Sequence, residues 1–197
     1  MHKLVESYRL PLEPVKRRSK IKDMPAGEKL RAKSTIDPFH VVLVEPEIPP
    51  NTGAVARTCA ATGSGLHLVG TLGFRIDERA VRRAGLDYWP LVDLHQHESL
   101  RAFEETSPGR QVHIFSANAK RSYLEADFRP GDALVFGKES VGLSAEIVER
   151  HAERCWAVPT IGAVRSLNLS NTVAIVLFEA LRRNGALDNV FRGAGAS

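Results

Sequence analysis

Small polar side chains that could bind a ligand are concentrated in residues 158–171 of this 197-residue chain. Ser166, Asn168, Ser170 and Asn171 lie within six positions, directly ahead of an apolar run. Oxygen atoms of such side chains accept hydrogen bonds from the free backbone N–H groups that begin a helix, and one residue is enough for that cap. Capping alone is the simpler interpretation, but four polar residues favour a loop that also binds something.

A second candidate segment, residues 45–57, carries Asn51 and Arg57 after three prolines. Proline fixes φ and lacks an N–H donor, so we interpret residues 45–50 as a loop. Asn51 is then expected to cap a helix that ends near Gly63. Helical side chains lean toward the N-terminus, so Arg57 would reach back over the opening turn. A surface salt bridge is the alternative role for Arg57.

A third segment, Gly137 to Leu143, holds Glu139 between glycines. All three segments follow apolar runs that predict strands. Strands are expected at 40–44, 66–69, 91–94, 112–116, 133–137 and 155–158, and helices near 51–61, 99–105, 144–151 and 172–183. This alternation predicts an α/β fold with a mainly parallel sheet flanked by helices. Ligands of such sheets bind beyond the carboxyl ends of the strands, where the three segments would meet.

Several classes of site and location are disfavoured. No strand is followed by the glycine pattern of a dinucleotide-binding domain, and we find no P-loop, nucleophile elbow or metal-binding His/Cys cluster. His95 and His97 are expected to face solvent, and Cys59 and Cys155 to be reduced and buried. No apolar run approaches the roughly 20 residues of a membrane span, and the first residues lack an apolar segment of the signal-peptide type, so we expect a cytoplasmic protein.

The positive charge of the chain is concentrated in its first 38 residues. This segment has ten Lys and Arg against five acids, a net charge of +5, which leaves −1 for residues 39–197. We interpret 1–38 as an extended or disordered arm before a single domain of 39–197. The arm is either a solvated tail or a contact for a polyanion through residues such as Lys16, Arg17 and Arg18. A second basic face, with Arg82 and Arg83 beside Tyr88 and Trp89, also suits nucleic acid.

Four stretches together resemble one family. Residues 45–53 with Arg57, residues 82–88, Gly137-x-Glu139-x-x-Gly142-Leu143 and residues 166–171 are similar to the SpoU branch of the SPOUT RNA methyltransferases. Within that branch they look most like the small tRNA enzymes that methylate the ribose 2′-oxygen of cytidine or uridine at the anticodon wobble position. The similarity extends from Val41 to about Asn184, so it says nothing about the arm.

The resemblance implies a C-terminal deep trefoil knot, a homodimer, a tRNA substrate and S-adenosylmethionine as methyl donor, with no metal. Cofactor contacts, carried over by position, fall on Ala117, Gly137, Val158, Ser166 and Leu167. Catalytic positions fall on Asn51, Arg57, Glu139, Ser166 and Asn168. RNA contacts are expected at Arg57, Arg82, Arg83, Lys16, Arg17 and Arg18.

Arg57 is expected to clamp a phosphate, because a guanidinium with a pKa above about 12 is a poor base. The general base is left unassigned. Two alternatives are methylation of another tRNA or rRNA nucleotide and an RNA-binding protein without catalysis.

Finally, the helix at 172–183 has an apolar stripe that Ile175 and Phe178 extend around its side. A helix this apolar must be covered on more than one face, and we expect a second subunit to supply part of the cover.

Overall fold

The structure is a computed structural model that describes residues 29–73 and 88–193. The predicted RNA contacts Lys16, Arg17, Arg18, Arg82 and Arg83 lie outside the described residues.

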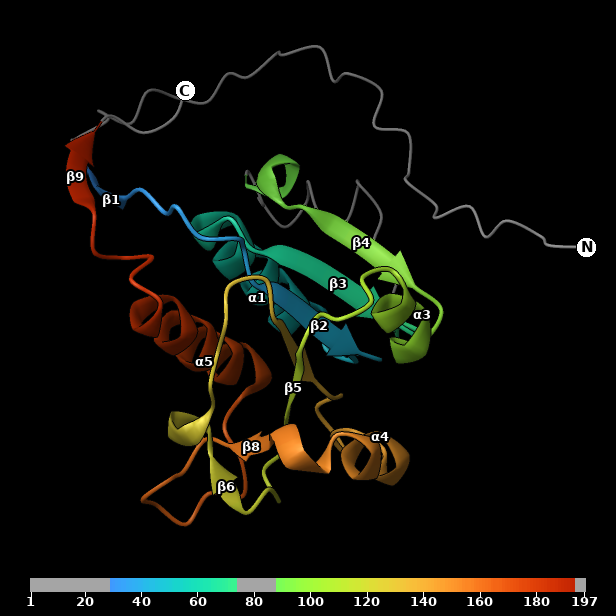
Figure 1. Cartoon of the computed structure of the whole chain (residues 1–197). Helices are drawn as coiled ribbons and strands as arrows, with labels where there is room; N and C mark the ends of the chain where they lie inside the picture. The colour runs from blue at the N-terminus through green and yellow to red at the C-terminus, as the bar shows by residue number, and fades with distance from the viewer. Residues whose placement is uncertain (1–28, 74–87, 194–197) are drawn as a thin grey trace, which may run out of the picture.

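Seven parallel strands form the central sheet, in the order β4-β3-β2-β7-β5-β8-β6 (Figure 1). The strands are β2 (His40–Val44), β3 (Gly65–Val69), β4 (Leu94–His97), β5 (Val112–Phe115), β6 (Arg121–Ser122), β7 (Ala133–Phe136) and β8 (Cys155–Ala157). All seven carboxyl ends therefore point to one edge of the sheet. This confirms the predicted α/β class with a parallel sheet.

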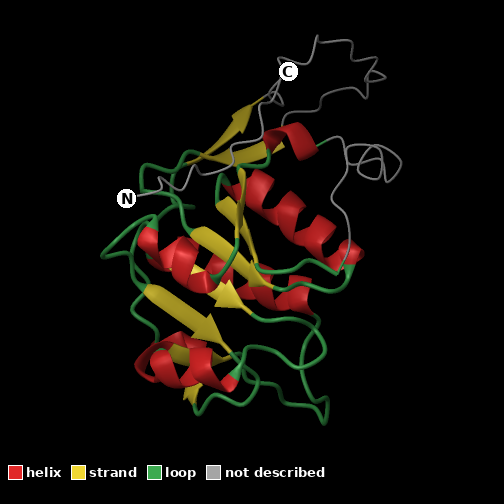
Figure 2. Ribbon diagram, turned by 90° about the vertical axis from the view of Figure 1, so that its right-hand side faces the viewer, coloured by secondary structure: helices red, strands yellow, loops and turns green. Residues whose placement is uncertain are grey.

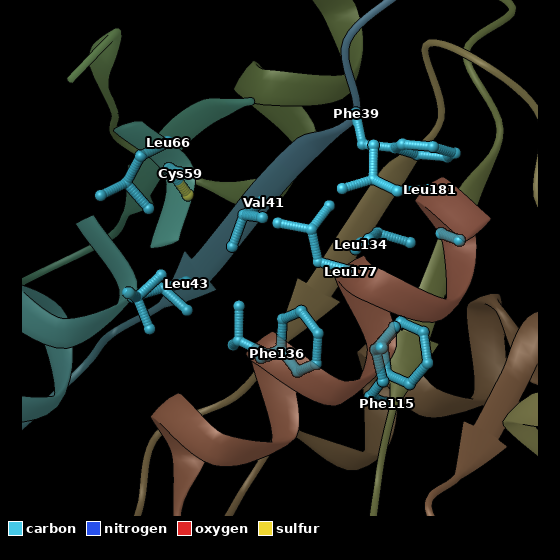
Figure 3. Packing of buried hydrophobic residues seen from close by; sticks show 14 of the residues in the cluster. Phe39, Val41, Leu43, Cys59, Leu66, Phe115, Leu134, Phe136, Leu177 and Leu181 are labelled. Carbon is cyan, nitrogen blue, oxygen red and sulfur yellow. The ribbon is translucent and has the colours of Figure 1, made fainter. Parts of the chain in front are cut away.

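Helices cover both faces of the sheet (Figure 2). They are α1 (Pro49–Thr62), α3 (Leu100–Glu105), α4 (Ala145–Arg150) and α5 (Leu169–Arg183), with short 3-10 turns η1 (Trp89–Leu91), η2 (Tyr123–Glu125) and η3 (Ala152–Arg154). Side chains alternate along β2, so that Val41 and Leu43 pack with α1 and α5, while Val42 packs on the other side with α3. Figure 3 shows the larger cluster, in which Leu177 and Leu181 of α5 lie against Val41 and Leu134.

The start of α1 corrects the sequence interpretation. The helix begins at Pro49, two residues before Asn51, and Ile48 is its N-cap without a side-chain hydrogen bond. Proline is compatible with the first helical position, where an N–H would be unsatisfied anyway. Asn51 is therefore a residue of the first turn and not the cap, so its amide is available for other contacts. The strand expected at 91–94 lies instead at 94–97, after η1.

The helix α5 begins three residues earlier than predicted, with Asn168 as its N-cap. The predicted stripe is confirmed: its five members are buried, namely Val173, Val176, Leu177, Ala180 and Leu181. Ile175 and Phe178 are 39% and 46% exposed, so the outer side of α5 keeps apolar surface in the single chain.

A small second sheet joins segments near the two ends of the chain. Strand β1 (Lys29–Ala32) pairs antiparallel with β9 (Val190–Gly193), apart from the main sheet (Figure 1). We call this two-stranded sheet the β1–β9 ribbon. Four residues of the predicted arm 1–38 thus form a paired strand. Residues 1–28 lie outside the described residues, and the domain boundary at 38 stays a prediction.

Histidines on β2, β3 and β4 form a hydrogen-bonded chain. His67 Nε2 lies 2.9 Å from His40 Nδ1, and His67 Nδ1 lies 2.9 Å from His97 Nε2. Residues two apart on a strand share a face, so His97 lies on the same face of β4 as His95. The prediction that His97 faces solvent is wrong, because its ring packs on the rings of His67 and Phe103. Burial lowers the pKa of His40 to about 4 and of His67 to about 2.

The remaining sequence predictions concern location and redox state. Cys59 and Cys155 are free and buried, as expected. Among the described residues no helix is long and apolar enough to cross a membrane.

Candidate functional site

One amide connects the three polar segments at the carboxyl edge of the sheet. Asn51 Nδ2 in α1 donates to Glu139 Oε1 at 2.8 Å, and its Oδ1 accepts from Asn168 Nδ2 at 2.9 Å. Glu139 follows β7, and Asn168 ends the loop that leaves β8. Glu139 and Asn168 lie 88 and 117 positions after Asn51 in the sequence, and the nitrogen and oxygen of the Asn51 amide bind one each. We call Glu139, Asn51 and Asn168 the amide network.

The Glu139 carboxylate also holds the loop after β2. It accepts hydrogen bonds from the backbone N–H of Glu47 at 2.9 Å and of Ile48 at 3.3 Å. The contact is reciprocal, since Ser140 N–H donates to Glu47 Oε2 at 3.0 Å. Hydrogen bonds from the side chain and backbone of Ser140 lower the pKa of Glu47, so this carboxyl is ionised at neutral pH. Two facing loops are therefore fastened by paired carboxylate contacts.

A salt bridge that sequence reasoning missed closes the same pair of loops. Lys138 Nζ lies 2.8 Å from Glu45 Oε2, and this hydrogen bond raises the pKa of Lys138. Glu45 adopts a φ of +48°, which a non-glycine residue rarely does outside functional turns. Both residues lie within the stretches on which the resemblance rests. They are 93 positions apart, however, and no local sequence pattern indicates that they are paired.

The turn after β7 requires glycine at position 137. A Cβ atom there would lie 2.2 Å from the backbone carbon of Gly142 and 2.3 Å from the nitrogen of Leu143. The turn is closed by Gly142 N–H, which donates to the Lys138 carbonyl at 2.9 Å. Close backbone approach thus fixes the position of Glu139 between them.

Asn168 has two separate roles. Its Oδ1 accepts from Ser170 N at 2.9 Å, Ser170 Oγ at 2.7 Å and Asn171 N at 3.4 Å, which caps α5. Its Nδ2 is left to bind Asn51. The predicted capping role is therefore confirmed, and the same residue also links the loop to α1; ligand binding by this loop stays a prediction. Ser166 is exposed and makes no hydrogen bond to the amide network.

Arg57 lies on a different side of α1 from Asn51. Its guanidinium carbon is 4.6 Å from the centre of the Tyr88 ring, and the Tyr88 hydroxyl donates to the Gly53 carbonyl at 2.8 Å. Tyr88 thus fixes one face of the guanidinium by a cation–π contact. No ion pair to Arg57 occurs among residues 29–73 and 88–193, so the sequence alternative of a salt bridge receives no support there.

An open apolar cleft of about 490 Å³ lies beside the loop that follows β8. Its walls include Val158 and Leu167, two of the predicted cofactor contacts, and the fully exposed side chain of Ile161. Clefts of this volume accept small organic ligands. Ala117 and Gly137 follow β5 and β7 at the same edge of the sheet, but they do not line this cleft.

The site therefore has three parts: a network of amide and carboxylate hydrogen bonds, an exposed arginine stacked on Tyr88, and an apolar cleft. A guanidinium binds phosphate through paired N–H donors, and the cleft suits a flat or aliphatic group. In the part of the chain that is described, no group of three or more His, Cys, Asp or Glu side chains is arranged to hold a metal ion.

Comparison with known proteins gives consistent matches. The model of the SpoU rRNA Methylase family matches residues 38–178. A tRNA (cytidine(34)-2′-O)-methyltransferase of Burkholderia pseudomallei is 48% identical over 151 residues, which cover 75% of this chain and 96% of that protein. A structure solved to describe 2-OH methylation of C/U34 on tRNA has a TM-score of 0.70 at 48% identity and covers 75% of this chain and 97% of its own. The structure of an AdoMet-bound rRNA methyltransferase from Sinorhizobium meliloti has a TM-score of 0.65 at 26% identity, and the match covers 77% of this chain and 58% of that one.

Proposed function

Because this chain belongs to the SpoU rRNA Methylase family, we propose that it transfers a methyl group from S-adenosylmethionine to the ribose 2′-hydroxyl of cytidine or uridine at position 34 of tRNA. The observation that carries this proposal is the amide network, in which three of the four stretches of the family resemblance meet through Asn51. The family model matches residues 38–178, a range that includes Asn51, Arg57, Glu139 and Asn168.

The residues at the carboxyl edge fit the proposed methyl donor. The cleft has the volume of a small-ligand site, and its walls are mostly aliphatic, which suits the adenine ring and the methylene groups of the donor. Val158 and Leu167 would hold the donor from the cleft, with Gly137 and Ala117 at the neighbouring strand ends and Ser166 in the loop. Bound there, S-adenosylmethionine supplies a methyl group on a cationic sulfur, so that no metal is required to activate the leaving group.

Arg57 serves in this proposal as the phosphate clamp. Its positive charge beside the reacting ribose lowers the pKa of the 2′-hydroxyl and holds the flanking phosphate in place. Tyr88 restricts the guanidinium to one orientation, which reduces the entropy lost when RNA binds. A guanidinium remains protonated at neutral pH, so Arg57 acts by charge and position and not as the base.

The amide network serves as the support that places the reacting groups. Asn168 links the loop of the cleft to Asn51, which lies in the helix that carries Arg57. Glu139 links Asn51 and the loop after β2 to the turn after β7. Methyl transfer requires the oxygen, carbon and sulfur atoms in line. Correct placement of reacting groups can contribute on the order of 7 kcal/mol or more to catalysis.

Three further properties belong to the same proposal. The segment from β8 through α5 forms the deep trefoil knot of this family, which ordinary chain topology would argue against. The protein is a homodimer, supported by the exposed apolar side chains of Ile175 and Phe178 on α5. It works in the cytoplasm.

The proposal is tested by incubating the purified protein with S-adenosylmethionine and unmodified tRNA, followed by mass-spectrometric mapping of 2′-O-methyl groups. We expect one methylated nucleotide, C34 or U34. Methylation at another tRNA position, or of ribosomal RNA alone, would replace the proposed substrate. Binding of tRNA without any methyl transfer would favour an RNA-binding protein that has lost catalysis.

A further inference from the structure

The β1–β9 ribbon presents a basic face that carries one aromatic side chain. Residues directly opposite each other on antiparallel strands point to the same side, and Arg31 lies opposite Phe191. Lys29 is two positions from Arg31 on the same strand, so it shares that face. Phe191 is 50% exposed, and all four residues of β1 are exposed. The arrangement of cations around an accessible ring is typical of surfaces on which nucleic-acid bases stack.

The two strands of the ribbon contain basic side chains and no acidic ones. The two strands hold three cations and no carboxylate, and Lys33 follows directly, with its N–H bonded to the Asn189 carbonyl at 3.0 Å. Within the described ranges, Lys29, Arg31 and Arg192 take part in no ion pair. Residues 39–197 as a whole have a net charge of −1. The ribbon is therefore a local positive surface on a body that is otherwise close to neutral.

The ribbon lies outside the part of the chain that matches the family. The family model ends at residue 178 and begins at residue 38, so neither β1 nor β9 is included. The relative from Burkholderia pseudomallei is matched over 96% of its length by only 75% of this chain. The ribbon is thus additional to the methyl-transfer unit. It also lacks a core of its own, since Leu30 and Val190 are 68% and 56% exposed.

From these observations we infer that the β1–β9 ribbon is a second RNA contact, which binds the tRNA away from the nucleotide that is methylated. The inference rests on the proposed function, because tRNA is the ligand. The ribbon and the loop that contains Asn168 lie at opposite ends of α5 (Figure 1). A helix of 15 residues is about 22 Å long at 1.5 Å per residue, so within one chain the ribbon is separated by this length from the loop of the proposed site. Lys29 and Arg31 bind phosphates, and Phe191 on the same face supplies a stacking surface.

The test compares two charge-matched double variants, K29Q/R31Q on the ribbon face that carries Phe191 and R101Q/R129Q elsewhere. Arg101 and Arg129 have side chains that are 80% and 62% exposed, so each pair removes two surface charges. Binding of full-length tRNA is measured without methyl donor over a range of salt, and KM and kcat are measured separately. We expect the ribbon variant to raise the KM for tRNA by about fivefold or more and to reduce the salt slope by about one to two phosphate contacts. The kcat and the methylated nucleotide should not change.

A third variant, F191L, tests stacking, because leucine keeps apolar surface but removes the ring. We expect weaker tRNA binding with an unchanged salt slope. Thermal unfolding of each variant checks that the body is folded. Equal tRNA affinity and salt slope in both double variants would overturn the inference, even if the wild type methylates tRNA normally. A ribbon variant that binds tRNA normally but has a smaller mass by light scattering would also overturn it, since the ribbon would then be a subunit contact. A wild type that binds tRNA but never methylates it would instead refute the proposed function.

Discussion

Replacement of Asn168 by aspartate separates the two roles of this residue. Aspartate keeps the oxygen that caps α5, where it accepts from Ser170 and Asn171. Asn, Asp and Ser are about equally good N-caps, and a negative charge at a helix N-terminus contributes about 0.3–1 kcal/mol. The variant loses the Nδ2 donor, however, and places a carboxylate oxygen near Asn51 Oδ1, which accepted that donor at 2.9 Å.

The expected result is a variant that is folded but slow. Loss of one hydrogen bond costs about 1 kcal/mol, which the better cap charge partly offsets, so Asn168→Asp should unfold within about 4 °C of the wild type. Misplacement of the cleft loop should lower kcat at least about tenfold, equivalent to about 1.4 kcal/mol. Asn168→Ser keeps a cap without adding charge and should also be slow.

The control is Asn168→Ala, which loses cap and link together. Its melting temperature should fall by a further roughly 2–4 °C, because a missing N-cap costs about 1 kcal/mol. The measurements are single-turnover methyl transfer to tRNA and thermal unfolding of all three variants. An aspartate variant with activity within about twofold of the wild type would refute the functional role of the Asn51–Asn168 link.

Three other outcomes follow from the structure. Arg57→Ala should abolish turnover while cofactor binding and folding persist. Arg57→Lys should also be inactive, because a point charge cannot replace the planar guanidinium. Single-turnover rates above about a tenth of wild type would contradict the role of Arg57 as a phosphate clamp. The folded pKa values of His40 and His67, about 4 and about 2, lie below the unfolded value near 6.5. The unfolded chain therefore binds more protons below pH 6.5, so the free energy of unfolding measured in urea should be greatest above pH 6.5 and should fall on acidification. In His40→Asn the slope of this fall should be smaller by up to about 1.4 kcal/mol per pH unit. Light scattering at micromolar concentration should give the mass of a dimer, and the double substitution of Ile175 and Phe178 by serine should shift it toward a monomer.

The sheet and most of its elements could be predicted from the sequence because the signals are local. Continuous apolar runs predicted β2, β7 and β8 to within one residue, and Ser144 and Ser99 cap α4 and α3 as expected of serine before a helix. The predicted start of α1 is wrong, because proline fits the first helical turn and Pro49 begins the helix.

Contacts between distant segments could be anticipated only in outline. The sequence placed Asn51, Glu139 and Asn168 at one edge of a parallel sheet, and the structure shows them in direct contact. It did not predict the Lys138–Glu45 salt bridge or the pairing of β1 with β9, because neither has a local pattern that names its partner. The roles assigned to the site residues stay predictions until they are measured.

The most direct test of the central claim uses tRNA in which a single ribose lacks its 2′-hydroxyl. With the deoxy sugar at position 34, the protein should bind the tRNA but transfer no methyl group from labelled S-adenosylmethionine. With the deoxy sugar at position 33 or 35, transfer should continue at nucleotide 34. Undiminished transfer to the tRNA with the deoxy sugar at position 34 would contradict the account, because the acceptor would then be another atom or another nucleotide.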